Sequence, residues 1–113
     1  MNVEHSGRID ATFPAVVFAA RRALVAFGYC EVEHRGGGSR YTILRGWGMQ
    51  RGVLIRLDHP GPGQSTAVQL RAVGRWASDP PTTYDIARAM LELHEIFDIV
   101  RAGCINPNRP SLA

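Results

Sequence analysis

The sequence predicts one α+β domain with two layers, in which two helices cover one face of an antiparallel meander sheet in the order β-α-β-β-β-β-α. Apolar residues recur at helical spacing near both ends of the 113-residue chain, and the stretch between them alternates with a period of two. Glycine clusters divide that stretch into four runs joined by short connections, which favours antiparallel neighbours. A chain of this length buries one core, so we expect a flexible lead-in over 1–7, a single domain over 8–103 and a flexible tail over 104–113.

Residues 8–12 alternate polar and apolar side chains and predict a short strand that leads into a helix. Thr12 is placed to cap this helix, Pro14 suits its first turn, and Gly28 can supply a left-handed end. A helix over 13–27 follows, and its apolar stripe comprises Phe13, Val17, Ala20, Leu24 and Phe27.

Four strands are predicted over 29–35, 39–49, 52–59 and 66–73. Odd-numbered positions of the second and third runs are expected to face the helices: Tyr41, Ile43, Trp47, Met49, Val53, Ile55 and Leu57. Even-numbered positions then form the outer face, where Leu44 and Leu54 are apolar exceptions. In the fourth run Val68 and Leu70 are the expected core residues.

Residues 79–83 are predicted to end the sheet and start the last helix, and Thr82 or Asp79 can cap it. Asp85 stands three residues after Thr82, at the capping-box position, as Asp in place of the usual Glu. Its core stripe is expected to comprise Ile86, Met90, Leu93, Phe97 and Val100, with Arg88, Glu92 and Glu95 on the other side. Gly103 is expected to end this helix.

The basic charge of the chain comes from thirteen arginines and no lysine, with a net charge of +3. Arginine suits carboxylates, phosphates and aromatic faces, although codon bias in a GC-rich genome would produce the same composition. This charge favours acidic partners but is far below that of a dedicated nucleic-acid binder.

No apolar run approaches the length that crosses a bilayer, and residues 1–8 have no signal pattern. A cytoplasmic location is therefore expected, with a periplasmic or envelope location as the alternative if a leader has been removed. Cys30 and Cys104 are too few for a disulfide scaffold and are expected to be buried thiols. A bridge between them is the alternative in an oxidising compartment.

Motifs that would indicate catalysis are absent from the sequence, and no GxSxG or HExxH pattern occurs. The four histidines His5, His34, His59 and His94 are dispersed along the chain. Cys30 and His34 would lie about 13 Å apart on a strand, too far for direct proton transfer. We therefore expect no enzyme activity, no metal and no cofactor.

The sequence Gly28-Tyr29 after an Ala-rich helix, together with residues 66–76, resembles a family of small bacterial lipoprotein domains of uncharacterised function. The resemblance covers about residues 8–100. It implies a bacterial protein with a helix, a meander and a final helix, and it offers no catalytic residues. Members are anchored through a cysteine near the mature N-terminus, whereas Cys30 lies beyond the first helix. Residues 9–14 are also similar to helix-grip proteins, which enclose a ligand between a curved sheet and a long helix.

We therefore expect a non-catalytic protein-interaction or assembly module whose open sheet face, edge strand or acidic-sided second helix binds another protein or its own copy. The candidate interaction surface comprises Arg40, Leu44, Leu54, Arg56 and Arg71. The first alternative is a small-ligand carrier with a pocket between the sheet and the C-terminal helix, lined by Tyr41, Trp47, Met90 and Phe97. The second is single-stranded nucleic-acid binding through an arginine and aromatic sheet face, which an outward position of Trp47 would favour.

Overall fold

The protein, in a computed structural model, is described over residues 3–36, 41–47, 51–58, 65–74, 76 and 80–105. The side chains of residues 32–36, 41–47, 51 and 105 lie outside this description. The elements are β1 (Glu4–Asp10), α1 (Phe13–Ala26), β2 (Cys30–Gly36), β3 (Tyr41–Trp47), β4 (Arg51–Asp58), β5 (Ser65–Gly74) and α2 (Thr83–Ile105).

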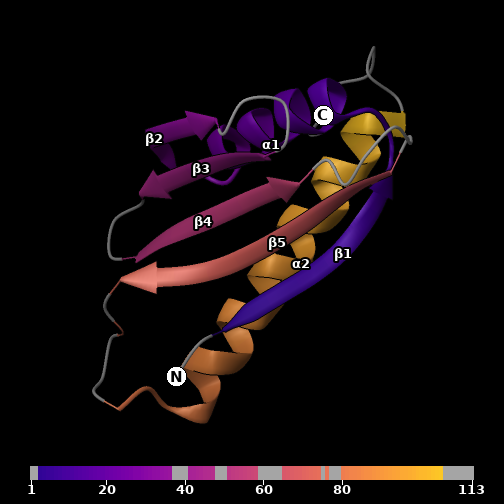
Figure 1. The fold of residues 1–113 in the computed structure, drawn as a ribbon. Coiled ribbons are helices and arrows are strands. Elements are labelled where there is room, and N and C mark those ends of the chain that lie inside the picture. Colours follow the sequence, from indigo (N-terminus) through magenta and orange to yellow (C-terminus); the bar gives the residue numbers. More distant parts are fainter. Residues whose placement is uncertain are drawn as a thin grey trace.

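The five strands form one antiparallel sheet in the order β1-β5-β4-β3-β2, and both helices lie behind it (Figure 1). The four strands after α1 form the predicted meander, and β1 returns to pair with the last of them. α1 packs against α2 and the β2 side of the sheet, while α2 runs behind β5 and β1. The predicted two-layer α+β class and the element order are confirmed.

β1 begins earlier than the sequence predicted, at Glu4, and Val3 before it is only 2% exposed. The expectation of a flexible lead-in over 1–7 is therefore wrong for residues 3–7, which belong to the sheet and its core. The alternation of polar and apolar residues does not extend visibly before residue 8, because Gly7, on the helix side of the strand, has no apolar side chain.

α1 ends as predicted, because Gly28 adopts a left-handed φ of 82° and Tyr29 N–H donates to the carbonyl of Leu24 at 2.9 Å. The predicted side-chain cap is wrong, since Thr12 makes no side-chain hydrogen bond at the helix start. The buried stripe of α1 also contains smaller residues than predicted, because α2 packs closely against it. Its buried residues are Val16, Ala19, Ala20, Ala23 and Leu24.

The predicted capping box at the start of α2 is confirmed in both directions. Thr82 N–H donates to Asp85 Oδ2 at 3.0 Å, and Asp85 N–H donates to Thr82 Oγ1 at 3.1 Å. The predicted end at Gly103 is wrong, because the helix continues to Ile105 while Val100 is fully buried and Cys104 packs against the core. Packing of the last turn offsets the roughly 1 kcal/mol that a glycine costs inside a helix.

The core-facing residues of α2 agree with the predicted stripe only in part. Leu93, Phe97 and Val100 are buried, but Ile86 and Met90 are half-buried, and Ala89 and Ile96 complete the buried set. Glu92, expected on the outer side, is half-buried and accepts a hydrogen bond from the hydroxyl of Tyr29.

The sheet faces of β4 and β5 are those that the sequence predicted. Val53, Ile55 and Leu57 are at most 1% exposed, and Val68 and Leu70 at most 2%. Thr66 shares this face, and its hydroxyl donates to the carbonyl of Ala11 at 3.1 Å, which satisfies the one fully buried hydroxyl of the strand.

The predicted faces of β3 are wrong, because the register of β3 with β4 reverses them. Leu44 lies opposite Ile55, and Ile43 lies opposite Arg56. Directly opposite residues of an antiparallel pair share a face, so the even-numbered positions of β3 lie on the helix side and the odd-numbered positions on the other. A shift of one residue at the connection moves every residue of a strand to the opposite face, and periodicity alone does not fix that shift.

Candidate interaction surface

No described helix covers the face of the sheet opposite α1 and α2 (Figure 1). We call this face the open face. Register sets its residues in rows across β1, β5 and β4. One row contains Glu4, Arg71 and Leu54. The other rows contain Ser6, Gln69 and Arg56, and then Arg8, Ala67 and Asp58.

Ion pairs connect the charged side chains of the open face. Arg71 Nε lies 2.7 Å from Glu4 Oε1, and Arg56 Nε lies 3.0 Å from Asp58 Oδ2. These side chains are 34% to 49% exposed, so each pair contributes at most about 1 kcal/mol to folding. Their main effect is to hold the guanidinium groups in place along the sheet.

Among the described side chains of the open face, positive and negative charges are equal in number, and some residues are apolar. Arg8, Arg56 and Arg71 stand against Glu4, Asp10 and Asp58 on β1, β4 and β5. Leu54 is half-buried on the same face, opposite Arg71. The described side chains of this face are therefore mixed in charge, with a half-buried leucine among them.

Of the candidate surface residues, Leu54, Arg56 and Arg71 are brought together on the open face as predicted. Arg40 lies outside the described residues, and so does the side chain of Leu44. The backbone position of Leu44 is opposite Ile55, on the helix side of the sheet. Leu44 and Leu54 therefore do not share an outer apolar patch, and that prediction is wrong.

The four residues of the predicted ligand pocket are not brought together. Phe97 is buried and Met90 half-buried beneath the sheet, on α2. The side chains of Tyr41 and Trp47 lie outside the described residues, but register sets these two positions opposite Asp58 and Gly52, on the open face. The register therefore does not set positions 41 and 47 on the helix side, where Met90 and Phe97 lie.

A contact between His5 of β1 and His94 of α2 was not predicted from the sequence. The two imidazole centroids are 3.9 Å apart, and the ring of Phe97 meets His5 edge-on at 5.0 Å. Burial and the neighbouring His94 lower the pKa of His5, and the carboxylate of Asp98 opposes this shift in part. The alternation of β1, if extended back to residue 4, would have placed His5 on the helix side with Ile9.

The two cysteines are free thiols, and they differ in environment. Cys30 is exposed at the start of the edge strand β2, so the prediction that it is buried is wrong. Cys104 is half-buried, and burial raises the pKa of its thiol. Within the described residues, no group of three His, Cys, Asp or Glu side chains is arranged to hold a metal ion.

No protein-family model, curated protein or solved structure matches this chain. The resemblance to small bacterial lipoprotein domains therefore stays a prediction. Among the described helices, neither has the length and apolar character that a membrane span requires.

Proposed function

We propose that this protein is a non-catalytic interaction module that binds another protein through the open face of its sheet. The observation that carries the proposal is the position of both helices on one side, which leaves a face with Leu54, Arg56 and Arg71 in contact with solvent. Arginine is enriched at the centres of protein interfaces, where its planar group pairs with carboxylates and packs on apolar groups.

Charge balance favours a protein over a nucleic acid as the partner. A polyanion gains affinity from each phosphate neutralised, but Arg56 and Arg71 already pair with Asp58 and Glu4 on the same face. Phosphates would have to displace these carboxylates. A protein surface with its own mixed charges can instead extend the existing rows of alternating charge.

The register of β3 supports single-stranded nucleic acid as the competing account. It places positions 41 and 47, which carry Tyr and Trp, on the open face with the arginines. Bases stack on aromatic side chains in such an arrangement. The experiment below therefore includes this outcome.

The test uses purified protein as bait in a lysate of the cells that naturally make it. Wild type is compared with Arg56→Ala/Arg71→Ala, and with the matched control Arg22→Ala/Arg88→Ala, whose changes lie on exposed helix positions. Quantitative mass spectrometry identifies proteins depleted by the first variant alone, and calorimetry with the purified partner then measures affinity. We expect the open-face variant to weaken binding at least tenfold and the control to retain it, with unchanged circular dichroism in both.

Equal binding of every captured protein by all three forms would contradict the proposal. The nucleic-acid account would replace it if wild type bound a fluorescent single-stranded oligonucleotide at physiological salt and the open-face variant did not.

A further inference from the structure

The outer edge of β1 has backbone groups that no described residue pairs with, since β1 is the first strand of the sheet and bonds only to β5. The carbonyl of Val3 accepts a hydrogen bond from Ala72 N–H at 3.0 Å. Backbone groups of successive residues point to alternate sides of a strand, so the odd-numbered residues of β1 bond toward β5. The N–H and C=O groups directed outward belong to Glu4, Ser6, Arg8 and Asp10.

Residues on the two sides of Ser6 are complementary to one another. If a second copy of β1 pairs antiparallel about a two-fold axis at Ser6, Glu4 lies opposite Arg8 of that copy on the open face. Val3 lies opposite Ile9 on the helix side, and His5 lies opposite Gly7. This single register therefore pairs opposite charges, pairs two apolar residues, and sets a large residue opposite a small one.

Neighbouring registers lack this match. An axis at Gly7 would set Glu4 opposite Asp10, and an axis at Arg8 would set that residue opposite itself. Like charges directly opposite in a sheet are destabilising. Charge therefore selects the register at Ser6 over the registers on that side.

The helix beneath this edge also has exposed apolar side chains. Leu91 is 60% exposed, and it precedes His94, which contacts His5 of β1, by one turn on the same side of α2. Tyr84, two turns before Leu91, is 66% exposed. Both side chains point away from the buried side of α2, which Ala89, Leu93 and Ile96 form, so they add no contact at the β1 edge.

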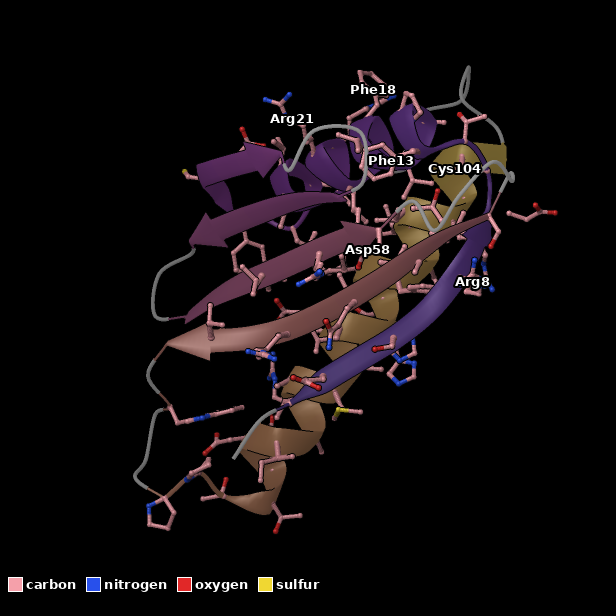
Figure 2. All side chains as sticks on the ribbon, viewed as in Figure 1. Arg8, Phe13, Phe18, Arg21, Asp58 and Cys104 are labelled. Atoms are coloured by element: carbon pink, nitrogen blue, oxygen red, sulfur yellow. The ribbon has the colours of Figure 1, made fainter. Side chains whose placement is uncertain are left out.

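We infer that β1 binds β1 of a second copy of this chain, in an antiparallel register centred on Ser6, so that two five-stranded sheets join into one continuous sheet. This inference goes beyond the proposed function, because it concerns the edge of the sheet and a copy of the same chain. Arg8 stands on β1 at the margin of the sheet, where the second copy would join (Figure 2).

Cysteine cross-linking tests the register. In a background with Cys30→Ser and Cys104→Ser, Ser6→Cys should form a disulfide-linked dimer under mild oxidation, because directly opposite Cα atoms of a hydrogen-bonded pair lie about 5.5 Å apart. The matched control Arg8→Cys should not, because in this register the two introduced thiols lie four residues apart along the strand, about 13 Å. Equal cross-linking of both variants, or of neither, would overturn the inference.

Sedimentation of the reduced protein tests the same inference without cross-links. Wild type should approach twice the monomer mass as concentration rises, and Ser6→Pro should stay monomeric with unchanged circular dichroism, because it removes an N–H that points away from β5. Glu4→Arg and Arg8→Glu alone should each raise the dimer dissociation constant several-fold, and the double charge swap should restore it toward wild type. A wild type that stays monomeric throughout, or a dimer that Ser6→Pro leaves intact, would overturn the inference. Binding of a different protein at the open face is unaffected by either result.

Discussion

Gly7 of β1 and Phe97 of α2 lie in close contact. A Cβ built on Gly7 would lie 2.7 Å from the Cζ of Phe97 and 2.9 Å from its Cε2. The ring is 7% exposed, with His5 against it and the guanidinium of Arg101 5.8 Å from its centroid. Glycine is therefore needed at this strand position for space, and the absence of a side chain brings strand and helix together.

Gly7→Ala is expected to destabilise the fold by about 1–3 kcal/mol, because the ring of Phe97 must leave its packed position. Chemical denaturation measures this loss, with Ser6→Ala at the adjacent exposed position as the control. The added methyl should cost less in a Phe97→Leu background, where the ring is absent. An equal cost in both backgrounds would show that the clash is not the cause.

His5 is expected to make stability depend on pH. Its pKa is lowered in the folded state by burial and by His94, whereas the unfolded chain titrates near the ordinary value of about 6.5. As pH falls through about 6.5, His5 gains a proton in the unfolded state before it does so in the folded state. The free energy of unfolding therefore keeps its full value above that pH and decreases below it, until the pH passes the pKa of His5 in the folded state. Asp98 on α2 opposes the shift and limits the loss.

Denaturation of wild type and His5→Gln from about pH 7.5 to about pH 5 measures this effect. The stability advantage of wild type should shrink as pH falls. His94→Gln removes the second cause of the shift, so its loss across the same range should be smaller than that of wild type. An advantage that is independent of pH would contradict the prediction.

At the scale of the element, the two helices start by different means. α2 has the reciprocal hydrogen bonds of Thr82 and Asp85, whereas α1 starts with Pro14 in its first turn and no side-chain cap. The main-chain carbonyl of Thr12 still accepts the bond from Val16 N–H at 3.0 Å. Two threonines at equivalent sequence positions thus differ. Only Thr82 is followed by a carboxylate at the third residue, which makes the reciprocal bond.

Thr82→Ala is expected to cost about 1 kcal/mol, since it leaves the N–H of Asp85 without its side-chain acceptor. Thr12→Ala is the matched control and should cost less than about 0.5 kcal/mol, as expected for an exposed position without a capping bond. Thermal or chemical denaturation distinguishes the two. Equal losses would indicate that Thr82 acts through something other than its cap.

At the scale of the whole molecule, one core lies between the sheet and the helix layer. Every strand and helix that has described side chains contributes to one cluster, except β2, whose described side chains are exposed. The other side of the sheet is held by ion pairs and half-buried residues. This asymmetry provides stability on one side and leaves the other, within the described residues, exposed to solvent, where we propose that a partner binds.

Adjacent residues of β4 test this asymmetry. Ile55→Ala, at a fully buried position, should cost about 2–5 kcal/mol, and Leu54→Ala on the open face should cost less than half as much. Equilibrium denaturation of dilute protein gives both values. A loss at Leu54 as large as that at Ile55 would mean that the open face is covered, and would argue against its proposed role.

The sequence by itself determined the class and order of the elements, the left-handed end of α1 at Gly28, the cap at Thr82 and the faces of β4 and β5. These features depend on neighbours within a few residues, which periodicity and turn chemistry report directly. The tertiary structure alone decided that β1 starts at Glu4 and returns to β5, that His5 meets His94, and that β3 has the register that moves Leu44 to the helix side. The reason is that strand register and contacts between distant segments depend on connection geometry and packing. The local alternation of polar and apolar residues carries no information about either.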